Sequence, residues 1–357
     1  MAETSFFSRP RIRAISTMLP SGSLDLRDLA DEYPDYDIEK VIKGTGIKRV
    51  TIADENTTSS DLCVAAAQKL FEAGIVSPEK IDGVVFVTET ADYIIPHTAA
   101  VIQDRLGIPT DSITFDLHFG CPGYAYGLFQ AFMMIETGFC KKVLLCAGDT
   151  VSKLVNPKDR ALRMVIGDAG SATLIDNEGT SRSSFSFYTN GGGSKHLIVP
   201  AGGFRKPSLA GVTDILSYDN DGNARSEDDL FMNGMEIMVF ALREVRGIIE
   251  KNMAAMNWTN DDVDLFALHQ ANEIILKRVS RQLKVAPEKV PISMENTGNT
   301  GFVSIPLMLT NLYAGINEHL KKVIVCGFGA GLAIASTAVD LSDTIILPTG
   351  IIKEEDL

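Results

Sequence analysis

The sequence has little positive charge and little cysteine. Lys and Arg together number 33, against 46 Asp and Glu, and the formal net charge at pH 7 is −13. Because an acidic protein is repelled by phosphate-rich surfaces, we expect neither nucleic acid nor an anionic membrane as a partner. The five cysteines are an odd number and are scattered along the chain. That is typical of reduced thiols in the cytoplasm and not of a disulfide framework.

Three further signals are missing. Cysteine and histidine do not cluster at zinc-binding spacing, so we expect no metal. The N-terminal residues lack a basic region followed by an apolar core and therefore do not resemble a signal peptide. The longest uncharged run, residues 323–339, contains several glycines and is marginally short for a membrane span. It predicts two buried strands around a glycine-rich turn, in a soluble cytoplasmic protein.

Short apolar runs alternate with helix-spaced segments along the chain, which predicts the α/β class. The pattern begins again after residue 180, and no linker-like segment separates the two parts. We therefore expect two halves, residues 1–178 and 179–357, that share one core. The clearest expected strands are 84–87, 113–119, 142–147, 173–175, 263–268 and 322–326, and the clearest helices are 58–73, 97–106, 230–252 and 306–314.

The stretch 113–141 is the most informative. A strand, expected to be buried, ends at Phe119. Gly120 permits a tight turn, and Pro122 suits the first turn of a helix that is apolar nearly all round. Such a helix belongs in the middle of a large core, with Cys121 at its N-terminus. Unpaired backbone N–H groups and the helix dipole favour a thiolate there, which predicts a nucleophile. The alternative is a small buried cysteine in a turn.

Two other junctions carry polar residues. His269 closes an apolar strand and precedes Gln270-Ala271-Asn272, and Asn299 lies in a glycine-flanked turn. Alone, His269 is interpreted as a hydrogen-bonded structural histidine and Asn299 as a turn former. Together with Cys121 they are also consistent with a cysteine–histidine hydrolase or transferase. Spacing alone does not decide between these interpretations.

In this order, Cys121 before Pro-Gly, the segment 269–272 and the segment 298–300 resemble the β-ketoacyl-acyl-carrier-protein synthase III family of the thiolase superfamily. The resemblance spans essentially the whole chain. It implies a thiolase fold, in which two similar α/β halves, each with a mixed five-stranded sheet, stack in five alternating layers. Further matching segments are 45–47, 159–160, 167–170, 231–234 and 328–331.

The resemblance also implies a chemistry. Cys121 would take an acyl group from a thioester. His269 and Asn299 would then hold the thioester carbonyl of a malonyl-type substrate while it loses CO₂. The resulting carbanion attacks the acyl group on Cys121 and gives a β-ketoacyl product, as in fatty acid or polyketide biosynthesis. The backbone N–H groups of Cys121 and Ala330 would hold the second oxyanion.

Substrate contacts are implied at four further positions, Ile95, Arg160, Asn272 and Phe328. Ile95 lies in a loop that, in the family, crosses a dimer interface into the partner's acyl pocket, so a homodimer is expected. No bound cofactor is implied. The substrates would be thioesters of coenzyme A or of acyl carrier protein.

Departures from the family leave the acyl donor open. Lys40 and Gly44 stand where the family carries the Trp and Arg that clamp the adenine of coenzyme A, and Ile274 replaces an Arg used in carrier docking. The helix after His269 is basic in an otherwise acidic protein. This predicts either a dock for an acidic carrier protein or a solvated helix face. The residues concerned are Lys277, Arg278, Arg281 and Lys284.

The sequence therefore predicts a condensing enzyme, with two rivals. One is an acyltransferase that passes the acyl group from Cys121 to an alcohol or amine, and the other is a non-catalytic subunit of a heterodimeric synthase. Asn299 favours condensation, because relatives that acylate alcohols tend to carry Asp there. Glu89 and Asp92 are interpreted as solvated charges, with acid–base groups as the alternative. His118 is interpreted as a hydrogen-bonded core residue, with tuning of the thiol as the alternative.

Overall fold

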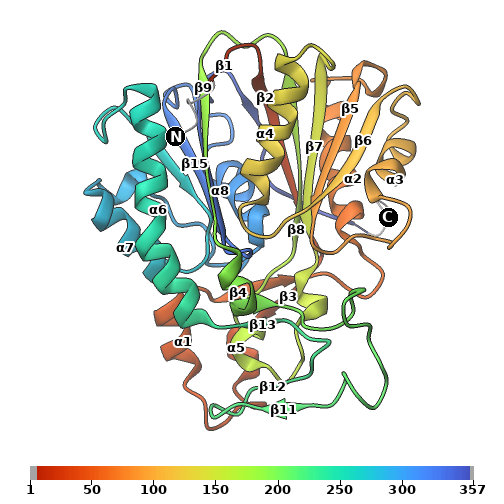
Figure 1. Cartoon of the computed structure of the whole chain (residues 1–357), viewed down its shortest axis with the longest axis vertical. Coiled ribbons are helices and arrows are strands. Elements are labelled where there is room, and N and C mark those ends of the chain that lie inside the picture. The colour runs from red at the N-terminus through yellow and green to blue at the C-terminus, as the bar shows by residue number, and fades with distance from the viewer. Residues whose placement is uncertain (1–5, 354–357) are drawn as a thin grey trace.

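Two β-sheets organise the computed structural model, which describes residues 6–353 (Figure 1). The first sheet has the order β17-β2-β8-β7-β5-β6, and β18 also pairs with β2. β5 is parallel to β6 and β7, whereas β8 is antiparallel to β7 and β2. The bounds are β2 Arg11–Leu19, β5 Gly83–Thr88, β6 Ile113–His118, β7 Lys142–Asp149, β8 Ala169–Asp176, β17 Ile345–Ile346 and β18 Gly350–Ile351.

The second sheet has five strands in the order β1-β9-β16-β15-β14. β14 and β15 are parallel and the other pairs are antiparallel, so both sheets are mixed, as expected. β15 and β16 are the two buried strands predicted for residues 323–339. The bounds are β1 Phe6–Phe7, β9 Ser183–Thr189, β14 Leu265–Leu268, β15 Val323–Gly329 and β16 Ala333–Val339.

Helices form the remaining three layers (Figure 1). α4 (Gly123–Glu136) and α8 (Ser304–Leu312) lie between the sheets, and each contacts both of them. A helix in that place needs apolar residues on every side, which explains why α4 is apolar nearly all round. α2 (Ser59–Glu72) and α3 (Thr98–Arg105) cover the outer face of the first sheet, and α6 (Gly234–Met256) and α7 (Glu273–Leu283) cover that of the second.

The shorter elements gather below the sheets in Figure 1. β10 pairs with β13, and β3 pairs with β4. α6 starts later than the predicted residue 230 because Phe231–Met232 forms β13 instead. The remaining bounds are β3 Gly22–Asp25, β4 Arg49–Ile52, α1 Ile38–Thr45, α5 Arg160–Arg163, β10 Leu197–Ile198, β11 Ser217–Tyr218 and β12 Ala224–Arg225.

Three details differ from the sequence-based expectation or extend it. β6 was expected to be buried, but it is the edge strand of the first sheet and its residues are partly exposed. The first sheet gains β17 and β18 from the C-terminal part of the chain, while β1 from the N-terminal part joins the second sheet. The division at residues 178 and 179 falls between β8 and β9 and stays a prediction. Within residues 6–353, no helix is both long and apolar enough to cross a membrane.

Candidate active site

One cavity of about 960 Å³ brings the three predicted catalytic side chains together. Cys121 reaches it from the first half of the chain, and His269 and Asn299 reach it from the second. An apolar chamber with a few converging polar groups suits an acyl chain with a reactive carbonyl at one end. Among residues 6–353, no group of three or more His, Cys, Asp or Glu side chains is placed to hold a metal ion. The apolar wall includes Val151, Leu154, Val165, Ile166, Leu197, Val199, Leu230, Met232 and Ile237.

A tight turn places Cys121 between the end of β6 and the start of α4. The Gly123 N–H donates to the Gly120 carbonyl over 2.7 Å. β15 passes beside this turn so closely that a Cβ on Gly329, whose φ is +155°, would lie 2.7 Å from the Cys121 sulfur. Only glycine permits that approach in that backbone conformation. The glycine-rich turn after β15 thus brings the next residue, Ala330, to the nucleophile.

The Cys121 sulfur accepts hydrogen bonds from two backbone N–H groups, its own and that of Ala330. These are the two donors expected to form an oxyanion hole. The pKa of the thiol is nevertheless raised to about 12, because burial and then the negative charge of Glu89 outweigh the two hydrogen bonds. The resting site therefore holds a thiol. The expectation of a thiolate is wrong because burial, with the charge of Glu89 added to it, outweighs the effect of the helix terminus.

His269, directly after β14, is buried and neutral. Burial lowers its pKa to about 4, and the nearby Gly301 carbonyl only partly opposes this. The Nδ1 atom lies 2.9 Å from the Ser304 hydroxyl, which also accepts the Gln270 N–H over 3.0 Å. We assign the hydroxyl proton to the Nδ1 contact, so Nε2 carries the ring proton. The Phe328 ring packs edge-on against the imidazole, with 5.4 Å between centroids, and fixes its orientation.

Asn299 is held by its own backbone and by its side-chain oxygen. The Asn299 N–H donates to the Val165 carbonyl over 2.8 Å, and its carbonyl accepts the Gly167 N–H over 3.0 Å. The Oδ1 atom accepts the Gly301 N–H over 3.0 Å. Because the carboxamide oxygen is used within the turn, the Nδ2 protons remain for the cavity. Asn299 and His269 therefore supply two uncharged N–H donors to the same cavity as the thiol.

Glu89 is a cavity residue that the sequence analysis placed in solvent. It follows β5 and lines the cavity, and a Cβ on Gly120 would lie 2.9 Å and 3.0 Å from its two carboxyl oxygens. Burial raises the pKa of Glu89 to about 7. Its N–H donates to Asp149 Oδ1 over 2.7 Å, and burial followed by the charge of Glu89 raises the pKa of Asp149 as well. The prediction of a solvated Glu89 is wrong, because β5 ends at the cavity.

The predicted substrate contacts divide into two groups. Asn272 and Phe328 line the cavity. Arg160 does not, since its guanidinium group stacks on the ring of Tyr36, 4.2 Å from the centroid. Ile95 is 85% exposed and also lies outside this chain's cavity.

The four basic residues of the candidate carrier dock are all exposed, on α7 and at its C-terminal end. Lys277 pairs with Glu273 on the same helix, and Arg278 contacts the Met238 sulfur of α6 over 3.9 Å. Asn272, which caps α7, also lines the cavity. The start of α7 therefore reaches the cavity, and the four basic residues follow along the same helix to its C-terminal end.

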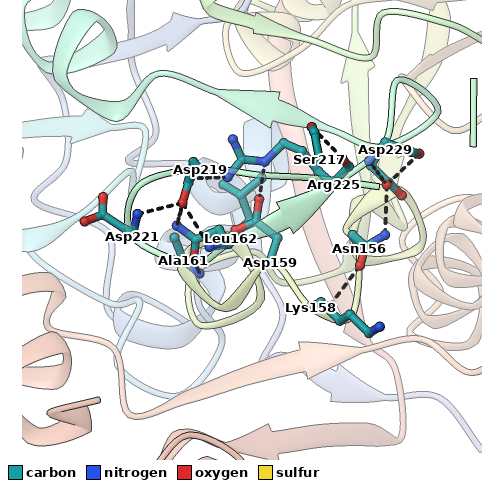
Figure 2. A network of polar contacts seen from close by, with 12 residues as sticks. Asn156, Lys158, Asp159, Ala161, Leu162, Ser217, Asp219, Asp221, Arg225 and Asp229 are labelled. Atoms are coloured by element: carbon teal, nitrogen blue, oxygen red, sulfur yellow. Dashed lines mark hydrogen bonds and ion pairs between the residues drawn. The ribbon is translucent and has the colours of Figure 1, made fainter. Parts of the chain in front are cut away.

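A polar network fixes the segment that leads into the cavity residues Leu230 and Met232 (Figure 2). The Arg225 guanidinium donates to the buried Asp159 carboxylate over 2.8 Å and to Asp219 over 3.0 Å. An ion pair with one fully buried partner is costly to break from one side, since the remaining charge stays buried. The sequence analysis missed this network, because residues 159 and 225 share no local pattern.

Comparison with known proteins agrees with this geometry. Residues 115–191 match the family model described as 3-Oxoacyl-[acyl-carrier-protein (ACP)] synthase III, and residues 253–341 match its C-terminal counterpart. A β-ketoacyl-[acyl-carrier-protein] synthase III of Natranaerobius thermophilus is 33% identical, over 86% of this chain and 94% of that protein. One of Caldanaerobacter subterraneus is 30% identical, over 93% and 97%.

Solved structures show the same resemblance. A 3-oxoacyl-(acyl-carrier-protein) synthase from Burkholderia xenovorans LB400 aligns with a TM-score of 0.90 at 31% identity, over 98% of this chain and 99% of that one. A 3-oxoacyl-(acyl-carrier-protein) synthase III structure at 37% identity aligns with a TM-score of 0.88, over 93% and 99%. The thiolase fold and the condensing-enzyme class expected from the sequence are confirmed. This chain belongs to the 3-oxoacyl-acyl-carrier-protein synthase III family.

Proposed function

We propose that this protein loads an acyl group on Cys121 and condenses it, with decarboxylation, with a malonyl-type thioester. One observation carries this proposal. A single cavity holds a thiol with two backbone N–H donors at its sulfur, together with two uncharged side-chain donors, His269 and Asn299. Acyl transfer to Cys121 needs the first pair of donors, and decarboxylation needs the second.

Two oxyanions form during this reaction. When Cys121 attacks the acyl thioester, charge develops on the acyl oxygen, which the N–H groups of Cys121 and Ala330 would stabilise. When the malonyl carboxylate leaves as CO₂, charge moves to the thioester oxygen, which His269 Nε2–H and Asn299 Nδ2–H would stabilise. Loss of one such donor typically lowers kcat about 10²–10³-fold.

The low pKa of His269 matters for the second step. With a pKa of about 4, the imidazole is uncharged near neutral pH. It then donates a hydrogen bond to the enolate oxygen without an acidic proton that would quench the carbanion. The carbanion stays free to attack the acyl group on Cys121. Neutral donors thus favour carbon–carbon bond formation over simple decarboxylation.

The basic face of α7 supports an acyl carrier protein as one thioester partner, because its charge is opposite to that of an acidic carrier. Coenzyme A remains the other candidate. The Arg160 guanidinium and the Tyr36 ring already form a stacked pair, and a nucleobase binds such flat surfaces by stacking. This aromatic group comes from a position other than Lys40, where the family clamp predicts it. The five free cysteines support a reducing compartment such as the cytoplasm.

A homodimer is the expected assembly. No strand of residues 6–353 pairs with the outer edge of β6, and such an edge is a ready site for pairing with a second copy. The nearby loop exposes three apolar side chains, Tyr93, Ile94 and Ile95, to 59%, 82% and 85%. Burial of this loop against a partner would place Ile95 in the other subunit's acyl pocket.

The first experiment records the intact mass of the protein after incubation with a panel of acyl-coenzyme A and acyl-carrier thioesters. We expect a mass gain in the native protein and none in Cys121→Ala, because Cys121 is the one cysteine among the described residues that line the cavity. Addition of a malonyl donor should then discharge the acyl group with release of CO₂. Discharge only to an alcohol or amine would favour the acyltransferase. No acylation by any donor would favour the non-catalytic subunit.

A further inference from the structure

Glu89 lines the same cavity as Cys121 and has no role in the reaction described above. The Glu89 carboxyl lies against the backbone next to the nucleophile, as the 2.9 Å and 3.0 Å distances from a Cβ on Gly120 require. The same Cβ would lie 2.7 Å from the Ala330 side chain. The carboxyl therefore lies next to the backbone that precedes Cys121 and near Ala330, and it lines the same cavity as the thiol.

The thiol proton has to leave Cys121 before or during its attack on a thioester. With a pKa of about 12, only roughly 10⁻⁵ of the sulfur is ionised at neutral pH. His269 is a weak proton acceptor, since its pKa is lowered to about 4 and its Nδ1 is engaged with Ser304. Ionisation of the Cys121 thiol in water and transfer of its proton to His269 are therefore both unfavourable.

The other titratable groups near the thiol are placed less well. Asp149 lies behind Glu89 and does not line the cavity, and its Oδ1 accepts the N–H groups of Glu89 and Thr90 and two threonine hydroxyls. Asp228 lines the cavity but accepts hydrogen bonds from two hydroxyl groups, of Ser208 and Thr213. His118 is exposed and lines the cavity, so its interpretation as a hydrogen-bonded core residue is wrong, and it is the remaining rival. A proton acceptor works best with a pKa near the working pH, and Glu89, with a pKa of about 7, meets this condition.

We propose that Glu89 accepts the thiol proton of Cys121 during acylation, directly or through one water molecule, and passes it to the departing thiolate. This inference rests on the proposed role of Cys121 as the nucleophile. In acylation, the bond from the sulfur to the acyl carbon forms and the thioester C–S bond breaks. The thiol proton moves to Glu89 and then to the leaving sulfur, so Glu89 ends the step as a carboxylate.

The condensation step balances in the same way. The carbanion forms a C–C bond to the acyl carbon, CO₂ has left, and the bond from that carbon to the Cys121 sulfur breaks. Glu89 first takes up a proton from water and passes it to the released thiolate, so that it is a carboxylate again for the next acylation. One proton is consumed in this step, as the loss of CO₂ from a carboxylate requires.

The charges near the oxyanion hole support this route. A free thiolate would add a negative charge beside the two carboxyls Glu89 and Asp149. If the proton moves to Glu89 as the sulfur attacks, that carboxyl becomes neutral while charge appears on the acyl oxygen. The total charge around Ala330 N–H stays constant, so the low-dielectric site does not have to hold an additional anion.

The test measures the rate at which iodoacetamide alkylates Cys121, followed by intact mass between about pH 5 and pH 9. In the native protein we expect the rate to rise through an inflection near pH 7, the pKa of Glu89. Glu89→Gln should lose that inflection and react about 10²–10³-fold more slowly at neutral pH. Glu89→Asp should keep the inflection with a smaller loss of rate, which preserves the test if the Gln variant folds poorly.

The matched control is Asp92→Asn. Asp92 is a carboxyl three residues further on, with a pKa also raised by burial, but it accepts a hydrogen bond from Ser60 over 2.7 Å and does not line the cavity. Its replacement should leave the inflection in place.

Two results would overturn the proposal. Faster alkylation of Glu89→Gln would mean that Glu89 only repels the thiolate, since loss of its charge would then lower the pKa of Cys121. Loss of the inflection in His118→Gln, with Glu89→Gln unchanged, would assign the proton to His118. Alkylation needs no acyl substrate. Failure of the native protein to accept any acyl group would therefore count against the proposed function and leave this test intact.

Discussion

Cys121 and His269 lie at equivalent strand-to-helix junctions of the two halves, and the side chains around them differ in charge. Each residue lies between the end of a parallel strand and the start of a helix, β6 and α4 for Cys121, β14 and α7 for His269. Burial raises the pKa of the thiol and the negative charge of Glu89 raises it further, whereas burial alone lowers the pKa of the imidazole. Both groups are therefore uncharged at rest. The backbone sets the position of each group, and the neighbouring side chains set its protonation state.

The largest expected effect is that His269→Ala slows condensation without preventing acylation of Cys121. His269→Ala removes a donor for the enolate oxygen but leaves the donors at the Cys121 sulfur. We expect condensation to slow about 10²–10³-fold while acylation of Cys121 persists. Single-turnover measurements of mass gain and of CO₂ release report the two steps separately. An equal decrease in the rates of acylation and condensation would mean that Cys121 and His269 do not act independently.

The next effect tests the close approach of β15 to Cys121. Gly329→Ala would place a methyl group 2.7 Å from the sulfur and 2.8 Å from its Cβ. We expect a loss of about 1–3 kcal/mol in the free energy of unfolding, and no acylation. Chemical denaturation and intact mass measure these effects. Gly247→Ala is the control, because it lies within α6 with open space around it and should stabilise the helix by up to about 1 kcal/mol. Acylation by Gly329→Ala at the native rate would contradict the packing argument.

The smallest expected effect is on the free energy of unfolding, through the raised pKa of Glu89. The pKa of Glu89 is raised on folding, so folding takes up a proton between the pKa of the unfolded chain and about pH 7. Native stability should therefore fall as the pH rises through that interval. Glu89→Gln should be more stable than the native protein at pH 8, by about 1–2 kcal/mol after allowance for partial exposure, and the difference should vanish at acidic pH. Urea unfolding at two pH values measures it, and a difference independent of pH would contradict it.

The sequence predicted the layered fold and the residues of the cavity better than it predicted their chemistry. Cys121, His269 and Asn299 stand in recognisable local patterns, and the structure brings all three to one cavity. Glu89 could not be placed from the sequence, because a charged residue after a strand looks the same whether the strand ends in solvent or at a cavity. The contact between Tyr36 and Arg160 likewise depends on segments far apart in the chain.

The pairing of β2 carries a consequence for the order of folding. β17 and β18 lie parallel to β2, more than 300 positions earlier, with Ile345 opposite Ala14 and Gly350 opposite Met18. During synthesis, this edge of β2 therefore stays uncovered until residues 345–351 have left the ribosome. Contacts between residues so distant in sequence form late in folding. Until they form, the unpaired edge of β2 is a possible site of aggregation. We therefore expect the first sheet to be completed only after residues 345–351 have been synthesised.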